Sequence, residues 1–387
     1  MSEAERAKEL FLAGLDQLDR RQFAEAERQF RAALELAPGR ASIRTNLAVV
    51  LADQGKNREA LDIARDLVAE DPSNDEALLV AAKAASDADE PDEALRLWKI
   101  VLERDIDRIR AHFGIAAAYR QKGQTVEALA AYERVLRLQP DHLHAAINRG
   151  NILFEQEKFA QALELYRRAA ASNPGSALAW IAVGNARLRL AQQLRAGRKP
   201  APGEPDQADL SLQAYKRALS IDRNAADAWQ GAGFAQLAAG AAAEALRSFD
   251  QALALGPHSA ALLAGKSCAL FDLGRAREAL VPGLKAVELD PNEPGGWTSL
   301  GNIQCDTGQA AEALVSQDRA LALDPSLRDA WNGRGNALRN LQRPREAIAA
   351  YDRALALDPD FAVARDNRAS TLLDLGDEAV TPSGPAH

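Results

Sequence analysis

The sequence predicts an all-α protein built as an α-solenoid, a stack of short helix–turn–helix units. Three observations predict it: the composition, the spacing of the prolines and the spacing of the tryptophans. The apolar residues, 47% of the chain, are mostly Ala and Leu, which favour helices, whereas the residue types that favour strands are sparse. A chain of 387 residues with this apolar content can bury a core and is not a disordered polymer.

A period of about 34 residues runs along the chain. Prolines recur one or two periods apart at Pro38, Pro72, Pro140, Pro174, Pro257, Pro291, Pro325 and Pro359, except that the gap from Pro174 to Pro257 is longer. Tryptophans repeat this pattern at Trp180, Trp229, Trp297 and Trp331, and their first gap is longer by the same amount. One insertion explains the exception in both series, so the two series report the same repeat.

Within each period the order of residue types is the same. A large residue comes first, a small residue follows four positions later, and after a turn come Ala, an aromatic residue, another Ala and a closing Pro. The last full period has these at Trp331, Gly335, Ala347, Tyr351, Ala354 and Pro359. Spacings of three and four place each set on one face of a helix, where large residues fill the space that small residues leave on the neighbouring helix. The proline then ends the second helix.

This pattern resembles the tetratricopeptide repeat, a helix–turn–helix unit of the same length. The resemblance covers the repeats 7–40, 41–74, 75–108, 109–142, 143–176, 177–225, 226–259, 260–293, 294–327 and 328–361. It implies twenty-one helices in a right-handed superhelix, because a final helix at about 362–375 caps the ten pairs. We expect residues 1–375 to form a single solenoid and residues 376–387 to form a disordered tail.

Two repeats depart from the pattern. Repeat 177–225 contains the insertion, at about 194–208. Its first helix is expected to run on through RLRLAQQLRAG, and GRKPAPGEPDQ, residues 197–207, reads as a loop because it is rich in Pro and Gly. We expect this loop to lie outside the core. Repeat 260–293 has Pro282 and Gly283 where an aromatic residue usually stands, and a proline inside a helix costs roughly 3 kcal/mol.

Composition and charge exclude several classes of protein. A net charge of −8 argues against a general nucleic-acid binder, which needs a basic face. The first residues, MSEAERAKEL, lack the apolar region of a secretory signal, and we find no apolar stretch long enough to span a membrane. Only two cysteines are present, fewer than a secreted disulfide scaffold carries. We therefore expect a cytoplasmic protein.

No motif in the sequence predicts catalysis, a metal or a cofactor. His142 and His144 are close together, but no cysteine or pair of carboxylates completes a ligand set. The run Gly265-Lys266-Ser267 imitates the end of a phosphate-binding loop, but it lies inside a predicted helix and lacks the first glycine. Cys268 and Cys305 lie in adjacent repeats and are expected to be small buried thiols. We predict that the chain is not an enzyme.

The resemblance also indicates where a partner would bind. In the family, the first helices of the repeats line a concave groove that holds an extended peptide or a helix of another protein. Asparagines recur at groove positions, at Asn148, Asn151, Asn185, Asn302, Asn332, Asn336 and Asn367. An Asn amide has a donor and an acceptor, so it pairs with a peptide backbone of any sequence. The alternative is that Asn after Gly simply belongs to the repeat consensus.

Two branches of the family use asparagines in this way. The O-GlcNAc transferase branch carries an asparagine ladder, which here is broken and shifted. The chaperone-binding branch holds a C-terminal carboxylate with two Lys, two Asn and an Arg. Asn336 and Asn367 match the two Asn of that clamp, but Asn332 stands where a Lys is required.

Charged residues at groove positions change sign along the chain. The earlier repeats carry cations at Lys83, Arg110, Arg120 and Arg189, and the later repeats carry acids at Asp227, Asp272, Asp306 and Asp329. If this difference is functional, an acidic part of a partner should face the earlier repeats and a basic part the later ones. The alternative is a random distribution of surface charge.

These observations support three functions. The first is a non-enzymatic scaffold or adaptor that binds a protein or peptide in its groove. The second is a regulatory or substrate-recruiting subunit of a protein-modifying enzyme, such as a glycosyltransferase whose catalytic domain is on another chain. The third is a structural protein that self-associates through the solenoid ends.

Overall fold

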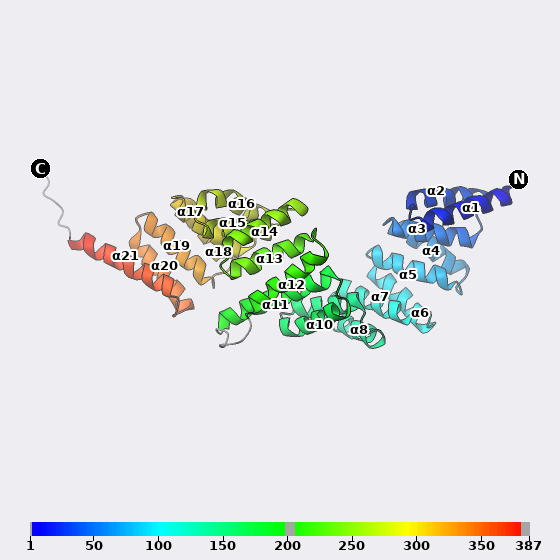
Figure 1. The fold of residues 1–387 in the computed structure, drawn as a ribbon, viewed down its shortest axis with the longest axis horizontal. Helices are drawn as coiled ribbons and strands as arrows, with labels where there is room; N and C mark the ends of the chain where they lie inside the picture. Colours follow the sequence, from blue (N-terminus) through cyan, green and yellow to red (C-terminus); the bar gives the residue numbers. More distant parts are fainter. Residues whose placement is uncertain (1, 198–205, 381–387) are drawn as a thin grey trace. The chain divides into compact units, whose positions relative to one another are not determined.

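The computed structural model describes residues 2–197 and 206–380. In these residues the chain forms 21 α-helices and no β-strand, which confirms the all-α prediction and the number of helices. Packing groups the chain into two compact parts, the N-terminal body Met1–Pro174 and the C-terminal body Gly175–His387, which are described separately below (Figure 1). Most of the loop predicted at 197–207 lies outside the described residues.

The N-terminal body contains five helix pairs. Its first helices are α1 (Glu3–Asp19), α3 (Ala41–Asp53), α5 (Asp75–Asp87), α7 (Arg108–Gln121) and α9 (Leu143–Glu155). Its second helices are α2 (Phe23–Leu36), α4 (Asn57–Glu70), α6 (Pro91–Glu103), α8 (Thr125–Leu138) and α10 (Phe159–Ser172). Short turns fold the two helices of a pair back on each other, as in other helical hairpins.

The C-terminal body continues the same order and ends on an unpaired helix. Its first helices are α11 (Ala177–Gly197), α13 (Ala226–Ala238), α15 (Ala260–Asp272), α17 (Pro294–Asp306) and α19 (Arg328–Asn340), followed by the final helix α21 (Ala362–Val380). Its second helices are α12 (Gln207–Ile221), α14 (Ala242–Leu255), α16 (Ala276–Leu289), α18 (Ala310–Leu323) and α20 (Pro344–Leu357).

The helix bounds differ slightly from the predicted ones at the loop and at the C-terminus. α11 runs through RLRLAQQLRAG to Gly197, as expected, and α12 begins at Gln207, so the two outermost residues of the loop predicted at 197–207 are helical. Ala208 is fully buried in α12, which explains why the helix starts that early. The final helix runs to Val380, so residues 376–380 are helical and not part of a disordered tail. Ala and Glu in this stretch favour the helix.

The two helices of a repeat fit together through one large and one small residue. In repeat 328–361, Tyr351 of α20 is fully buried against Gly335 of α19. A methyl group on Gly335 would lie 2.3 Å from Cε1 of Tyr351, so no larger residue fits at this position without a shift. The predicted small-to-large contact is therefore what fixes the distance between the helices of a pair.

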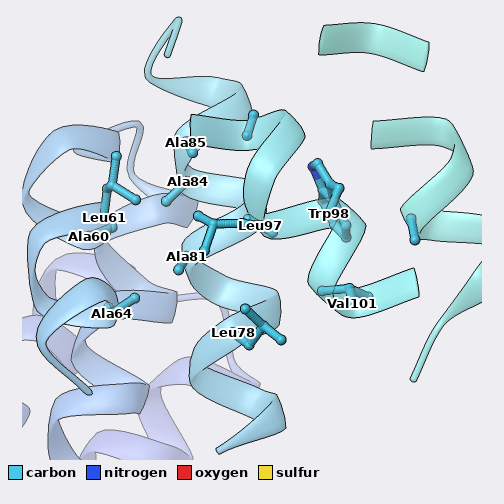
Figure 2. Packing of buried hydrophobic residues seen from close by; sticks show 14 of the residues in the cluster. Ala60, Leu61, Ala64, Leu78, Ala81, Ala84, Ala85, Leu97, Trp98 and Val101 are labelled. Carbon is cyan, nitrogen blue, oxygen red and sulfur yellow. The ribbon is translucent and has the colours of Figure 1, made fainter. Parts of the chain in front are cut away.

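Apolar contacts join successive repeats in the same way. Figure 2 shows Ala60, Leu61 and Ala64 of α4 beside the alanines of α5, with Leu97 and Trp98 of α6 on the other side. The Trp98 indole N–H donates to the hydroxyl of Ser86 at 2.9 Å. Alanine lets the helix backbones approach closely, so one continuous core runs through neighbouring repeats.

Ion pairs on the outer side connect one repeat to the next at a constant spacing in the sequence. They join Arg149 with Glu133, Lys266 with Asp250, Arg334 with Asp318, and Arg368 with Asp352, at distances of 2.5–3.3 Å. Each is partly exposed and contributes at most about 1 kcal/mol. They set the register between repeats more than they stabilise the fold.

The turn inside each hairpin repeats as regularly as the helices. One residue per turn adopts a positive φ between 58° and 82°, at Arg21, Gly55, Asp89, Gly123, Glu157, Gly240, Gly274, Gly308 and Gln342. These positions follow the period of the sequence, except across repeat 177–225, which contains the insertion. The left-handed residue therefore lets the second helix start directly after the first.

Candidate partner-binding face

Successive first helices contact one another in the middle of the N-terminal body and throughout the C-terminal body. In the N-terminal body α3 contacts α5 and α5 contacts α7, and in the C-terminal body each of α11, α13, α15, α17 and α19 contacts the next first helix. The second helices pack mainly on the first helices beside them. Because the first helices lie closer together, each stack curves toward the first helices, which form the expected groove side. We call the solvent-facing surface of these helices the first-helix face.

The predicted asparagines lie on this face, and tyrosines hold three of them in place. The buried Tyr166, Tyr215 and Tyr351 each donate their hydroxyl to an Asn Oδ1 on the first helix of the same repeat. The pairs are Tyr166–Asn151 at 2.7 Å, Tyr215–Asn185 at 2.7 Å and Tyr351–Asn336 at 2.8 Å. The Asn side chains themselves are exposed or half-buried.

This bond decides which way each amide points. Burial raises the pKa of Tyr351 to about 12 and raises the pKa of Tyr166 and Tyr215 as well, so all three phenols stay protonated and act as donors. The Asn Oδ1 is therefore used inside the repeat, whereas the Nδ2 donors form no hydrogen bond with the part of the chain that the structure describes. The sequence analysis missed these tyrosines, although the constant spacing from Asn151 to Tyr166 and from Asn336 to Tyr351 was a visible signal.

The other asparagines have different partners. The buried Gln317 donates to Asn302 Oδ1 at 3.0 Å, in the position that tyrosine takes elsewhere. Asn148 donates to the Tyr132 hydroxyl at 3.3 Å. Asn367 of α21 donates to Oδ1 of both Asn332 and Asn336, at 3.0 and 3.2 Å. The structure thus brings Asn332, Asn336 and Asn367 together, while Asn148 and Asn151 lie in the other body from Asn185.

The predicted cations of the N-terminal body are paired within the chain. Lys83 lies 3.2 Å from Asp53, and Arg110 lies 3.2 Å from Asp107. Arg120 of α7 reaches Glu155 of α9, at 2.8 Å. Arg189, in the C-terminal body, lies 3.1 Å from Gln192 Oε1. An acidic partner would have to displace these carboxylates, so the positive side of the predicted charge pattern is weaker than the sequence indicated.

In contrast to these cations, the predicted acids of the C-terminal body are almost all without an ion pair in the described residues. Asp227, Asp272 and Asp306 are exposed and form no ion pair among residues 2–197 and 206–380. Asp329 has only Arg328, its neighbour in sequence, at 3.8 Å. Burial raises the pKa of Asp272, since no cation offsets its partial desolvation. The negative charge on this face is therefore available to a partner.

The N-terminal body also has a cavity that the sequence did not predict. It lies between the start of α1, the end of α2 and the start of α3, and its volume is about 690 Å³. Phe11, Leu12 and Ile43 are among its apolar residues, and Lys8 and Arg40 are among its charged residues. Leu12 is 53% exposed.

The residues considered for metal binding, phosphate binding and thiol chemistry have ordinary structural surroundings. In the described part of the chain, no three His, Cys, Asp or Glu side chains are placed to hold a metal ion. Gly265, Lys266 and Ser267 lie inside α15, away from any helix start. Burial raises the pKa of the Cys305 thiol to about 11 and also raises that of Cys268, so both free thiols stay protonated.

The fold described above is a solenoid of helical repeats, and known protein families with such repeats match the sequence. Sequence profiles described as "Tetratricopeptide repeat" match residues 11–75, 79–142, 119–186 and 329–361, which together make up more than half of the chain. The chain belongs to the tetratricopeptide-repeat family.

Several curated proteins are similar over part of the chain. The human protein O-mannosyl-transferase TMTC1 is 28% identical over 163 residues, which is 41% of this chain and 18% of TMTC1. The mouse protein O-mannosyl-transferase TMTC3 is 27% identical over 36% of this chain and 15% of its own length. The CTR9 homolog of Arabidopsis thaliana is 29% identical over 30% of this chain and 10% of its own length. The chain thus spans less than a fifth of each relative.

In the described residues no helix is long and apolar enough to cross a membrane.

Solved structures are similar in fold. The Cut9–Hcn1 hetero-tetramer of the APC/C aligns with a TM-score of 0.51 and 15% identity, over 96% of this chain and 90% of that chain. YrrB, described as a TPR protein with an unusual peptide-binding site, aligns with a TM-score of 0.39 and 24% identity, over 52% of this chain and 96% of YrrB. The first match supports the solenoid fold and nothing beyond it.

Proposed function

We propose that this protein is a non-enzymatic scaffold or adaptor that binds an extended peptide or a helix of a partner protein on the first-helix face. One observation carries the proposal. Buried tyrosines fix the amides of Asn151, Asn185 and Asn336 so that Oδ1 is used within the repeat, and Nδ2 donates no hydrogen bond to any residue in 2–197 or 206–380. A surface with such oriented donors is suited to bind the carbonyl groups of a peptide.

The spacing of the repeats matches an extended peptide. Neighbouring packed helices lie roughly 8–10 Å apart, and an extended chain in the polyproline II conformation rises about 3.1 Å per residue with three residues per turn, so every third residue faces the same side. Equivalent amides on adjacent first helices, such as those of Asn302 and Asn336, would therefore meet every third residue of the peptide. Backbone contacts of this kind give affinity, while the side chains between them determine which partner is bound.

The test starts from peptides selected by the protein itself. A random dodecapeptide display library is panned against the immobilised full chain, and selected peptides are titrated against variants. Changing Asn336 to Ala would be ambiguous, because it leaves the buried Tyr351 hydroxyl without an acceptor. Asn336→Asp retains the acceptor for Tyr351 and Asn367 but removes the Nδ2 donor.

The expected result is a loss of affinity without a loss of stability. Removing one donor in each of two repeats, with Asn302→Asp and Asn336→Asp, should weaken a selected peptide by about 1–3 kcal/mol at nearly constant Tm. Gln161→Glu/Gln251→Glu is the control, because both side chains are exposed on second helices and the pair adds the same two negative charges. Equal affinity of all variants, or no selected peptide at all, would contradict the proposal.

A second candidate is a recruiting subunit that works beside a glycosyltransferase on another chain. The observation that favours it is the partial similarity to two protein O-mannosyl-transferases. Affinity purification from the native cells, followed by mass spectrometry, tests it directly. Recovery of a sugar-transferring chain would support this role, whereas recovery of the chain alone would favour self-association.

A further inference from the structure

We propose that the first-helix face of α13, α15 and α17 binds a basic, partly apolar segment of a partner protein, in an extended conformation. The inference rests on the proposed function, because it assumes that this face binds a peptide. It adds the chemistry of the partner, which neither the fold nor the family determines.

The first argument is the sign of the charge on these three helices. Between them they carry Asp227, Asp272 and Asp306 and a single cation, Lys266. Lys266 is already paired with Asp250 of α14, at 2.6 Å. No lysine or arginine in the described residues lies within ion-pair distance of the three aspartates, so a partner meets an uncompensated negative surface.

The second argument is the apolar surface between the aspartates. Phe234 and Leu237 of α13 and Phe271 of α15 remain partly exposed at first-helix positions. Phe234 packs edge-on against the buried Phe249, with ring centroids 5.1 Å apart, so its position is fixed from behind. Partly exposed aromatic rings beside unpaired carboxylates fit a segment that carries both apolar and cationic side chains.

The spacing of the aspartates predicts the spacing of the Lys and Arg residues in the partner segment. Asp272 and Asp306 occupy the same position in consecutive repeats and end α15 and α17. With first helices roughly 8–10 Å apart, an extended chain in the polyproline II conformation, which rises about 3.1 Å per residue with three residues per turn, presents every third side chain to them. The segment should therefore have Lys or Arg at positions i and i+3, with apolar residues between.

The N-terminal body has acids at the same repeat position, but its first helices also carry more cations. Asp53 and Glu155 are paired with Lys83 and Arg120 of neighbouring first helices, at 3.2 and 2.8 Å. Asp19 and Asp87 stand at this position as well, but α7, two helices after α5, carries three arginines and no acid. The attraction of a basic segment to α13, α15 and α17 should weaken with added salt.

The experiment reads the composition of the peptides that the full chain selects from the random dodecapeptide library. We expect enrichment of Lys and Arg with the i, i+3 spacing and apolar residues between them. Selected peptides should bind Asp272→Asn/Asp306→Asn about three- to 30-fold more weakly, with a flatter salt dependence. Both substitutions are conservative, and neither side chain forms an ion pair within the described residues, so the fold should not change.

The matched control carries the same change of net charge on the second helices. Glu288→Gln/Glu312→Gln alters exposed residues of α16 and α18 and should leave the affinity unchanged. An equal loss in this control would show that only net charge matters and would overturn the inference. Selection of acidic or uncharged peptides that depend on Asn302 and Asn336 would also overturn it while leaving the proposed function intact. Selection of no peptide would contradict both.

Discussion

Repeats 328–361 and 260–293 follow the same sequence pattern, but their helices pack in different ways. In repeat 328–361 the large Tyr351 fills the space over Gly335, and its hydroxyl reaches Asn336. In repeat 260–293 both positions are small, with Gly283 in place of the tyrosine and Ser267 in place of the glycine. There Ser267 Oγ is buried and donates to the carbonyl of Ala279 in α16, at 2.7 Å.

The comparison shows that the repeat tolerates the loss of its central contact if a hydrogen bond replaces it. Pro282 removes one backbone donor from α16, yet the helix continues from Ala276 to Leu289. Repeat 260–293 is therefore held together by fewer apolar contacts than repeat 328–361. We expect it to be the less stable of the two, and the next three predictions test this difference.

The largest expected effect is the loss of the tyrosine. Tyr351→Ala removes a fully buried ring and should destabilise the C-terminal body by about 3–5 kcal/mol. Hydrogen exchange should accelerate first in α19 and α20. Val315→Ala, at a side chain that is 68% exposed, is the control and should change little. If Tyr351→Ala were as mild as this control, the tyrosine would not be the residue that holds the pair together.

A smaller effect of opposite sign is expected at the proline. Pro282→Ala restores a backbone donor in the middle of α16 and should raise stability by up to about 3 kcal/mol. Pro344→Ala is the matched control, because Pro344 is the first residue of α20, where a missing donor makes no difference. Thermal melting of both variants measures this, and an equal response would remove the contrast between the repeats.

The two glycines should respond differently to a methyl group. Gly335→Ala forces a contact with the Tyr351 ring and should cost about 1–3 kcal/mol. At Gly283 the added methyl would lie 2.9 Å from Ser267 Oγ, which can move away only by weakening its bond to Ala279. We expect Gly283→Ala to cost less than Gly335→Ala, because the gain in helix propensity, about 1 kcal/mol, offsets part of the contact. Chemical denaturation of each variant decides this, and a larger loss at Gly283 would contradict the comparison.

The smallest expected effect is a dependence of local stability on pH. Repeats 260–293 and 328–361 serve as controls for it, because neither contains a histidine. His142 caps α9 by accepting the backbone N–H of Ala145 through Nδ1, at 3.1 Å. Burial lowers the pKa of His142, so its stabilising contribution is full above the unfolded pKa of about 6.5 and is lost as the pH falls through the folded pKa. Protonation of Nδ1 also removes the cap, worth about 0.5–2 kcal/mol.

Between about pH 7 and pH 5, the hydrogen-exchange protection factors of α9, which correct for the slower intrinsic exchange at low pH, should therefore fall more than those of α15–α20. His142→Asn keeps a capping side chain that does not titrate and should abolish most of the difference. His112 is buried nearby and its pKa is also lowered by burial, so a residual effect in α7 is expected. A uniform response of both bodies would show that His142 has no special part in it.

Most of the fold was predictable because it depends on local spacing. The periods of Pro and Trp located the helices, and the Gly–Tyr alternation predicted how they pair. The end of the final helix at Val380 was harder to predict, since helix-favouring residues continue past the repeat pattern there.

The site was predictable only in part. The positions of Asn151 and Asn336 follow from the repeat, but the role of their tyrosines depends on which side chains meet across a hairpin. The sequence did not show which charged side chains form ion pairs. Lys83 and Asp53 lie on different repeats, and only the packing of α3 against α5 brings them together. The same reasoning explains why the unpaired state of Asp272 and Asp306 became visible only in the structure.

The most direct test of the binding role is to find where a selected peptide contacts the chain. Peptides with a photoreactive residue are cross-linked to the full protein, and the adducts are located by mass spectrometry. The account predicts adducts on the first-helix face of the C-terminal body, at Phe271, Asn302 and Asn336. Adducts at Val281 and Val315, which are 71% and 68% exposed on the second helices, would contradict it.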